Sequence, residues 1–406
     1  MTAEVRPFDA LKGRRAHLGV CGSIAAYKAV ELMRALQRLG VHCSVTLTAS
    51  AARFITPLTF SSLGAEPVYG SMFGEDEGLS FAHLQPGRSA HAMLIAPATA
   101  TTIARLASGL ADEILSAQAL AFPGPLVIAP AMNPHMFAHP ATQANLRLLA
   151  DRGCDIVQPV SGVVACGDEG AGKLAPPAEI VFAAVRALVE QDMAGKRMLV
   201  TLGPTREPWD GVRVWTNRST GRMGAALVTA AALRGASVTA VAGPGVPGLP
   251  ECVTRIDAGS ARDMYEACLA VWPDCDYGVF TAAVADYAPQ PLGSGKFKKT
   301  DAPEGFSIAL TPNPDILATL AARASAGQKI LGFAAESGNL ENAARAKRER
   351  KKTHLLAAND ISRDDSGFGT PTNSMFVVDH NGREEQWPVL SKEEVAWRLL
   401  TWLSTL

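Results

Sequence analysis

The chain alternates between short apolar segments and longer segments with apolar residues at helical spacing, and it does so twice. This pattern predicts strands that are each followed by a crossover helix, as in a doubly wound parallel sheet. In the first half the expected strands are 17–20, 44–47, 92–96, 126–129 and 155–157, and the expected helices are 25–39, 102–107, 142–151 and 179–189. In the second half the expected strands are 198–201, 237–242, 277–281, 329–334, 354–357 and 375–378, and the expected helices are 225–234, 261–271, 316–324 and 340–350. The sequence therefore predicts an α/β fold of two doubly wound Rossmann-like domains.

The two runs of alternation are separated by the polar segment 190–196. A chain of 406 residues also exceeds what one hydrophobic core normally serves. We expect a disordered leader over residues 1–15, a first domain over 16–192 and a second over 193–406. The Gly/Pro-rich segments 243–250 and 288–305 predict mobile loops.

Composition excludes several classes of function. The net charge of -1 supplies no field for nucleic acid. The seven cysteines are scattered without CxxC or Cys/His spacing, which argues against disulfides and zinc and favours a reducing compartment, so we expect a cytoplasmic protein. No apolar run reaches the roughly 20 residues of a membrane span, and residues 1–15 lack the apolar core of a signal peptide.

Two Gly/Pro-rich turns carry a single amide and a single thiol. They are Pro130-Ala-Met-Asn-Pro-His-Met136 and Ser161-Gly-Val-Val-Ala-Cys-Gly-Asp168. The glycines that follow Cys166 allow the backbone to approach a ligand closely but bury little. Alone, Cys166 would be an ordinary loop cysteine, and Met132 and Met136 are better explained by packing. The combination of Asn133 with Cys166 favours a functional site.

The segment Gly19-Val-Cys-Gly-Ser-Ile-Ala-Ala-Tyr-Lys28 predicts a strand, a tight turn and the start of a helix. Backbone amides at such a turn suit a phosphate. The segment lacks a complete G-x-G-x-x-G and an acidic residue about 20 positions later, so it does not match a dinucleotide site. A mononucleotide such as FMN fits better.

With these motifs the chain resembles the flavin-dependent cysteine decarboxylases. It resembles more closely the bifunctional phosphopantothenoylcysteine decarboxylase/phosphopantothenate-cysteine ligase family of bacterial coenzyme A synthesis, over nearly the whole chain after residue 15. The resemblance implies a flavodoxin-like N-terminal flavoprotein domain that binds FMN and a C-terminal ligase domain. The implied FMN-binding residues are Gly22, Ser23, Thr48, Ser50, Thr99 and Thr102.

The resemblance also assigns three catalytic residues to the N-terminal domain. His83 matches the base, although Leu84-Gln-Pro follows it where the family usually continues with Ile-Glu-Leu. Asn133 would hold the substrate carboxylate with its amide donors. Cys166 would return a proton after decarboxylation. An amino-acid carboxylate leaves only with an electron sink, which FMN can create by oxidising the cysteinyl thiol.

A second series of motifs lies in the C-terminal half. The series is Gly203–Pro208, Asn217–Gly224, Ala282–Tyr287, Lys296–Lys299, Asn313–Ile316, Gly332–Glu336 and Lys347–Lys351. Each has an ordinary explanation, such as a helix N-cap, a solvated lysine loop or a charged helix face. In this order they resemble the ligase domain, which activates a carboxylate with CTP.

The ligase resemblance implies specific roles. Asn217 would orient an acyl-cytidylate, and Asp286 would lie near Mg2+. The lysines that would contact phosphate are Lys296, Lys347 and Lys351. The other implied nucleotide-binding residues are Ala282, Pro314, Asp315, Ile316, Leu317 and Phe333, most of them in a cytosine pocket. The chain departs from the family pattern at Arg218, where His is usual, at Arg222, where Lys is usual, and at Thr311-Pro312, where a Lys commonly precedes Asn-Pro-Asp.

We therefore expect a bifunctional enzyme with small-molecule substrates. It would join 4'-phosphopantothenate to L-cysteine with CTP and then decarboxylate the product to 4'-phosphopantetheine with FMN. The family implies a homo-oligomer, with decarboxylase trimers and ligase dimers building a dodecamer. One alternative is a flavin-binding regulatory protein without turnover. The presence of both Asn133 and Cys166 argues against this alternative. A second alternative is a nicotinamide dehydrogenase built on two Rossmann-like domains. It would need a complete G-x-G-x-x-G motif and an acidic ribose ligand, which we do not find in the chain.

Overall fold

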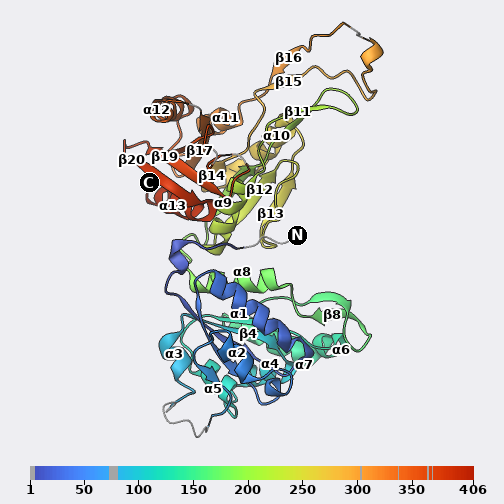
Figure 1. Ribbon diagram of the computed structural model, residues 1–406, viewed down its shortest axis with the longest axis vertical. Helices are drawn as coiled ribbons and strands as arrows, with labels where there is room; N and C mark the ends of the chain where they lie inside the picture. The colour runs from blue at the N-terminus through green and yellow to red at the C-terminus, as the bar shows by residue number, and fades with distance from the viewer. Residues whose placement is uncertain (1–4, 73–80, 302–303, 337, 364, 368) are drawn as a thin grey trace. The chain divides into compact units, whose positions relative to one another are not determined.

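The structure, a computed structural model, describes residues 5–72, 81–301, 304–336, 338–363, 365–367 and 369–406. The chain divides into two compact units between Glu190 and Gln191, and each unit has its own sheet (Figure 1). The N-terminal unit ends with residue 190, and the C-terminal unit comprises residues 191–406.

The N-terminal unit is built on a six-stranded sheet in the order β3-β2-β1-β4-β5-β6, with all neighbours parallel. Its strands are β1 (Arg15–Val20), β2 (His42–Leu47), β3 (Val68–Tyr69), β4 (Ala92–Ala98), β5 (Leu126–Pro130) and β6 (Asp155–Ile156). Every residue of β4 is buried, because helices cover both faces of a parallel sheet.

Helices α1 and α8 pack together on one face of this sheet, and α4, α5 and α7 enclose a core on the other face. The helices are α1 (Lys28–Arg38), α2 (Pro57–Ser62), α3 (Gln85–Ser89), α4 (Ala100–Ser108), α5 (Ile114–Leu120), α6 (Pro134–Ala138), α7 (Pro140–Asp151) and α8 (Pro177–Leu188). Short 3-10 helices lie at η1 (Asp9–Leu11), η2 (Ile24–Tyr27) and η3 (Ala51–Arg53). A separate hairpin of β7 (Val160–Val163) and β8 (Glu169–Lys173) precedes α8.

The expected disordered leader is wrong for residues 5–15. Helix η1 lies within this segment, and β1 already begins at Arg15. Phe8 and Leu11 are buried, because the segment packs its apolar residues against the unit. Residues 1–4 of the expected leader lie outside the described residues.

The C-terminal unit contains an eight-stranded sheet in the order β13-β12-β9-β14-β17-β18-β19-β20. The first six are parallel, whereas β19 and β20 run antiparallel at one edge. The strands are β9 (Arg197–Leu202), β12 (Ser237–Ala242), β13 (Thr254–Asp257), β14 (Tyr277–Phe280), β17 (Lys329–Glu336), β18 (Leu355–Asp360), β19 (Thr372–Asp379) and β20 (Glu384–Ser391). Two small antiparallel pairs are β10 (Arg206–Pro208) with β11 (Val214–Thr216), and β15 (Tyr287–Pro289) with β16 (Leu310–Pro312).

Helices again cover both faces of this sheet. Helices α9 (Arg222–Leu233) and α13 (Lys392–Thr405) pack together on one face. Contacts place α10 (Ala261–Val271), α11 (Ile316–Ala322) and α12 (Leu340–Lys351) on the other. Short 3-10 helices η4 (Trp272–Asp274) and η5 (Lys299–Asp301) complete the unit. The chain between β15 and β16 forms an arm that projects from the sheet beside β11 (Figure 1).

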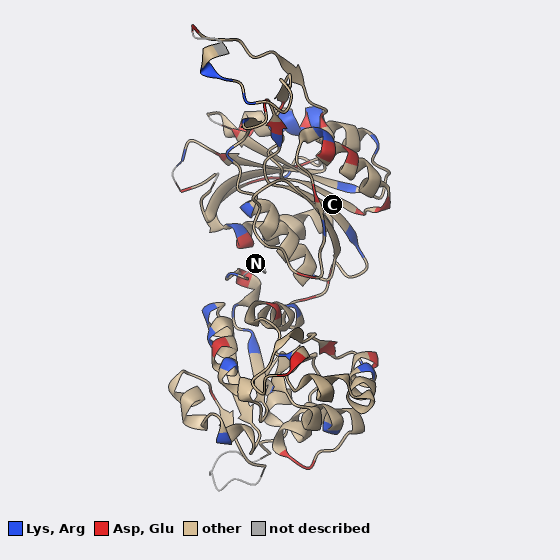
Figure 2. Cartoon of the chain, turned by 90° about the vertical axis from the view of Figure 1, so that its right-hand side faces the viewer, with Lys and Arg blue, Asp and Glu red and all other residues tan. Residues whose placement is uncertain are grey.

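The doubly wound α/β architecture predicted for both halves is confirmed. Basic and acidic residues are interspersed over each unit (Figure 2), in keeping with the net charge of -1. In the part of the chain that the structure describes, no helix has the length and apolar character needed to cross a bilayer.

Candidate functional site

The carboxyl ends of β1, β2 and β4 meet at one edge of the N-terminal sheet. Strand β1 lies between β2 and β4, so the chain leaves β1 in one direction and returns to its other side at β4. Ligands of open α/β sheets bind at such a switch point. Every residue expected to bind FMN follows one of these strands: Gly22 and Ser23 after β1, Thr48 and Ser50 after β2, and Thr99 and Thr102 after β4.

Hydroxyl groups shape the turns at this edge. Ser23 Oγ accepts a hydrogen bond from Ala25 N at 3.3 Å at the start of η2. Thr99 Oγ1 accepts one from Thr102 N, also at 3.3 Å, and so caps α4. A Cβ on Gly22 would collide with the Cβ of Ser50. The turn after β1 and the turn after β2 therefore approach each other closely only because residue 22 is glycine. Two capped helix starts at a switch point fit the phosphate of a mononucleotide.

Asn133 and Cys166 lie in contact although 33 residues separate them. Asn133 Nδ2 donates a hydrogen bond to Cys166 Sγ at 3.3 Å. The same nitrogen donates to Asp168 Oδ2 at 2.5 Å, and Cys166 Sγ donates to that oxygen at 3.4 Å. Asn133 Oδ1 accepts from His135 N at 2.8 Å and thereby caps α6. The structure therefore joins both predicted residues with Asp168, to which the sequence analysis assigned no role.

The β7–β8 hairpin carries Cys166 and Asp168 to Asn133. Met132 N donates to Gly172 O at 2.9 Å, and a Cβ on Gly172 would collide with Met132 O. The glycine thus allows β8 to lie against the segment that follows β5. Hydrogen bonds from Asn133 and then Cys166 lower the pKa of the exposed Asp168 carboxyl, so it is ionised at neutral pH.

His83 is not hydrogen-bonded to Asn133 or Cys166 within the described residues. It lies between the undescribed segment 73–80 and α3, two residues before the helix begins. A buried chain of hydrogen bonds holds the backbone beside it: Gln118 Nε2 donates to Ala82 O at 3.1 Å, and Thr46 Oγ1 donates to Gln118 Oε1 at 2.7 Å. His17 Nε2 meets Thr46 Oγ1 at 2.9 Å, and burial lowers the pKa of His17 to about 3, so its ring is neutral.

The C-terminal unit has a cavity of about 540 Å³ at the carboxyl ends of its strands. Strand β9 lies between β12 and β14, so this edge is also a switch point. The cavity is lined by most of the residues expected to bind the nucleotide or metal: Asn217, Ala282, Asp286, Pro314, Asp315, Ile316, Leu317, Phe333, Lys347 and Lys351.

Two amides hold the wall of this cavity that follows β14. Asn217 Nδ2 donates to Ala283 O at 3.0 Å, and Asn313 Nδ2 donates to Ala285 O at 2.9 Å. These bonds tie the segments before α9 and α11 to one stretch of backbone. The motifs Asn217–Gly224, Ala282–Tyr287 and Asn313–Ile316, which are far apart in the sequence, therefore form one surface.

Lysines of α12 provide positive charge in the cavity. Burial lowers the pKa of the half-buried Lys347, whereas the Glu336 carboxylate acts in the opposite direction. Lys351 forms an ion pair with Asp315, which also caps α11 by accepting from Ala318 N at 2.9 Å. Burial alone would raise the pKa of Asp315, but the bonds from Lys351 and Ala318 hold it below its usual value.

Two further cations line the cavity and tether one loop. Arg222 Nη1, at a position where the family usually has Lys, donates to Gly369 O at 2.7 Å. Lys392 Nζ donates to Gly367 O at 3.0 Å and to Asn373 Oδ1 at 3.1 Å. Sequence reasoning missed Lys392, because its position at the start of α13 shows no motif.

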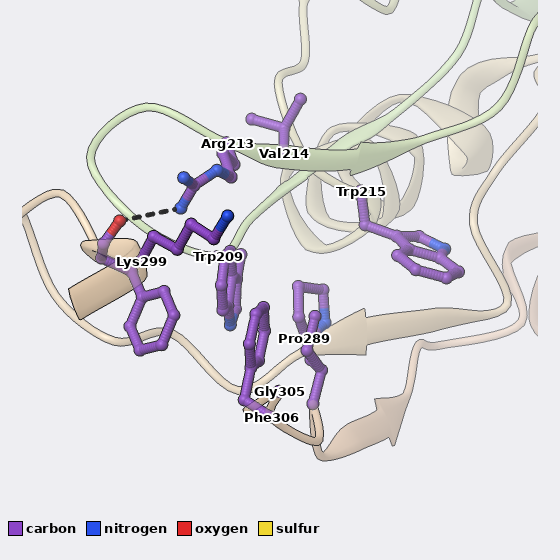
Figure 3. A pocket seen from close by; sticks show the side chains of 10 residues that line it. Trp209, Arg213, Val214, Trp215, Pro289, Lys299, Gly305 and Phe306 are labelled. Atoms are coloured by element: carbon purple, nitrogen blue, oxygen red, sulfur yellow. Dashed lines mark hydrogen bonds between the residues drawn. The ribbon is translucent and has the colours of Figure 1, made fainter. Parts of the chain in front are cut away.

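Lys296 is not among the residues that line the cavity. It lies on the arm, where its neighbour Phe297 packs with Trp209 and Phe306 in an aromatic cluster around a second pocket of about 610 Å³. Figure 3 shows Trp209 and Phe306 face to face and Arg213 above the indole. The centroids of the two stacked rings are 5.2 Å apart. Asp210 Oδ2 accepts from Phe297 N at 3.1 Å. The cluster therefore anchors the segment that carries Lys296.

The remaining expectations concern the metal and one departure from the family pattern. Among the described residues, no group of three or more His, Cys, Asp or Glu side chains could hold a metal ion. Asp286 would thus need ligands from a nucleotide and water to hold Mg2+. Pro312 pairs with Tyr287 in the β15–β16 ladder, so it ends a strand directly before Asn313.

Comparisons with known proteins cover both units. The family model "Flavoprotein" matches residues 5–189, and the model "DNA/pantothenate metabolism flavoprotein C-terminal domain" matches residues 193–406. A coenzyme A biosynthesis bifunctional protein CoaBC of Vibrio vulnificus (strain YJ016) is 39% identical over 98% of each chain. Proteins of the same name are 40% identical in Escherichia coli (strain K12), over 96% of each chain, and 39% identical in Bacillus subtilis (strain 168), over 98% of each. A crystal structure of the C-terminal domain of CoaBC is 35% identical, covers 53% of this chain and 97% of its own, and has a TM-score of 0.46.

Proposed function

The chain belongs to the CoaBC family of coenzyme A biosynthesis bifunctional proteins, and from this membership we propose which reaction each unit performs. The C-terminal unit is the ligase, which joins 4'-phosphopantothenate to L-cysteine with CTP. The N-terminal unit is the FMN-dependent decarboxylase, which converts the resulting phosphopantothenoylcysteine to 4'-phosphopantetheine and carbon dioxide.

The contact between Asn133 and Cys166 carries the proposal for the N-terminal unit. Bound FMN supplies the two-electron oxidation of the substrate thiol and the later return of a hydride. Asn133 holds the substrate carboxylate with its amide hydrogens, and Cys166 delivers a proton to the ene-thiol product. His83 is the base for the oxidative step.

The cavity of the C-terminal unit supports the proposal for the ligase. Lys347 and Lys351 offset the charge of the triphosphate, while the segment 314–317 and Phe333 take the cytosine. Attack of the phosphopantothenate carboxylate on CTP forms an acyl-cytidylate and releases pyrophosphate. Asn217 orients the acyl group while the cysteine amine displaces CMP. Lys296, which lies outside this cavity on the arm, would add positive charge toward the triphosphate, and Asp286 would be the protein ligand for Mg2+ that offsets the phosphate charge.

Three further properties follow from the same proposal. The protein works in the cytoplasm, in keeping with its seven scattered cysteines without disulfide or zinc spacing. It assembles as a homo-oligomer, as the family resemblance implies. It does not act on nucleic acid, in keeping with its net charge of -1.

One incubation tests the whole proposal. Purified protein loaded with FMN is mixed with 4'-phosphopantothenate and cysteine, and either CTP or ATP is added. The expected products with CTP are CMP, pyrophosphate, carbon dioxide and 4'-phosphopantetheine, identified by mass. Formation of phosphopantothenoylcysteine without its decarboxylation would refute the role of the N-terminal unit, and decarboxylation only of added phosphopantothenoylcysteine would refute the role of the C-terminal unit.

A further inference from the structure

The amide of Asn133 already contacts three groups of the chain. Its nitrogen donates to Asp168 Oδ2 at 2.5 Å and to Cys166 Sγ at 3.3 Å, while its oxygen accepts from His135 N. The proposed decarboxylation requires the same amide to donate to the substrate carboxylate. A substrate carboxylate that binds to Asn133 where Asp168 Oδ2 now lies must therefore displace this internal bond.

We propose that Asp168 is an internal stand-in for the substrate carboxylate. Its carboxylate accepts the hydrogen bond from Asn133 while the site is empty, and this bond breaks when the substrate carboxylate binds. The bond forms again after carbon dioxide has been released. This inference rests on the proposed function, because it takes Asn133 as the residue that binds the carboxylate. Asp168 is thus a specificity-determining residue, since only a ligand with its own carboxylate can replace it on the amide.

The chemistry of the two carboxylates favours this exchange. Asp168 is ionised, because the bonds from Asn133 and Cys166 lower its pKa. It presents to the amide the same kind of oxygen that the substrate would present. A product without the carboxylate cannot compete with Asp168, so the exchange also favours product release.

The position of Asp168 allows it to leave Asn133. The residue is exposed at the tip of the β7–β8 hairpin, so its carboxylate can turn into water without desolvation. The turn itself is held by the backbone, through Val164 N to Asp168 O and Gly167 N to Val164 O, both at 2.9 Å. Rotation of the side chain therefore leaves the hairpin intact.

Two unreactive ligands that differ only in a carboxylate provide the test. Phosphopantothenoylserine keeps the carboxylate and phosphopantothenoylethanolamine lacks it, and neither has a thiol to oxidise. Their affinities for the FMN-loaded full chain are measured by calorimetry. In Asp168→Asn, affinity for the serine ligand should rise roughly fivefold to tenfold, whereas affinity for the ethanolamine ligand should stay within about twofold.

A neighbouring carboxylate serves as the matched control. Glu169→Gln removes the same charge one residue further along the hairpin, where the backbone pairs with Val163. Its affinities for both ligands should stay within about twofold, because the repulsion between the exposed Glu169 carboxylate and an anionic ligand is screened by solvent and salt. If Asp168→Asn loses its flavin, Asp168→Ser replaces it with the same expectation.

Three results would overturn the inference. These are equal tightening of both ligands, no change in either, or weaker binding of the serine ligand, which would make Asp168 a direct substrate contact. If the proposed function itself is wrong, the result will differ from all three of these. The unaltered chain would then bind neither ligand and would release no carbon dioxide from phosphopantothenoylcysteine.

Discussion

Single side chains decide the local chemistry of both units, and Lys392 is the clearest case in the C-terminal cavity. All three hydrogens of its ammonium group are donated, to Gly367 O, Asn373 Oδ1 and Thr372 O. None of these acceptors is a carboxylate. Burial, followed by the nearby charge of Arg222, lowers the pKa of Lys392 from 10.5 to about 8.

This shift predicts how the stability of the C-terminal unit depends on pH. Between about pH 8 and 10.5 the folded state binds fewer protons at Lys392 than the unfolded state, so the free energy of unfolding should rise with pH. The total rise is on the order of 3 kcal/mol. Urea unfolding followed by tryptophan fluorescence measures it, because all six tryptophans lie in residues 191–406.

Two variants give this measurement its controls. Lys392→Met should lack the rise, whereas Lys196→Met, which changes an exposed lysine, should keep it. Parallel pH curves for the unaltered protein and Lys392→Met would contradict the prediction.

Cys166 carries the second prediction at this scale. Cys166→Ser should keep FMN and still release carbon dioxide, because oxidation and decarboxylation precede the return of the proton. Formation of 4'-phosphopantetheine should fall by about 100-fold or more. Mass analysis should detect the ene-thiol instead. Cys252→Ser, at an exposed cysteine of the other unit, is the control, and a normal product yield from Cys166→Ser would refute the assigned role.

At the scale of elements, the arm of the C-terminal unit depends on its aromatic cluster. Trp209→Ala removes the partner of both Phe297 and Phe306, which should free the segment that carries Lys296. Pyrophosphate release should fall roughly tenfold, since each lost aromatic pair is worth about 0.5–1.5 kcal/mol. Carbon dioxide release from added phosphopantothenoylcysteine should not change. Trp215→Ala, at a half-exposed residue of the same pocket, should have little effect on either rate.

The buried hydrogen-bond chain of the N-terminal unit has a direction that can be deduced. The carbonyl of Ala82 can only accept, so Gln118 donates to it and accepts from Thr46, whose hydroxyl must then accept from His17 Nε2. Gln118→Leu would leave Ala82 O without its donor and the Thr46 hydroxyl without its acceptor, both in a buried place. It should destabilise the unit by about 1–3 kcal/mol, measured by urea unfolding with flavin fluorescence.

Ser116→Ala is the matched control for this prediction. Ser116 is also buried on α5, but among the described residues its hydroxyl bonds only to Glu113 O, three residues earlier. Its loss should cost about 1 kcal/mol or less. Equal losses of unfolding free energy in the two variants would show that the chain of hydrogen bonds stabilises the unit no more than a single local bond does.

Elements with apolar runs were predictable from sequence, and elements held by close backbone contacts were not. The expected strands coincide with β1, β2, β4 and β5 and with β9, β12, β14, β17, β18 and β19, because a strand buried on both faces must be apolar. Strand β8 contains two glycines in five residues and resembles a loop. The antiparallel edge was missed although Asn381-Gly382, a strong hairpin signal, joins β19 to β20.

The site was predictable to a similar extent. Residue types and their roles came from the resemblance, and the structure brings ten of the expected ligase residues to one cavity. Asp168 and Lys392 could not be found from motifs, because their partners are known only after the hairpin and the loop have folded.

At the scale of the whole molecule, each unit should function alone. Gln191 Nε2 donates to Leu233 O at 2.8 Å and Asp192 pairs with Arg234, so both residues belong with the C-terminal unit. Fragments 5–190 and 191–406 should each fold, because each has its own core. The first should hold FMN and decarboxylate phosphopantothenoylcysteine, and the second should release pyrophosphate from CTP. An insoluble or flavin-free first fragment would show that it needs the second.

Both candidate sites lie at the carboxyl ends of parallel strands. The amino ends of these strands, on the opposite side of each sheet, carry none of the residues proposed to bind substrate or cofactor. Gly40 before β2 and Gly327 before β17 are exposed turns at those ends, with no neighbour within 4 Å of a built Cβ. Extra segments inserted there lengthen a surface loop at little entropic cost. Such turns are therefore the places where this architecture can acquire new appendages during evolution, or accept a fluorescent label, while both reactions continue.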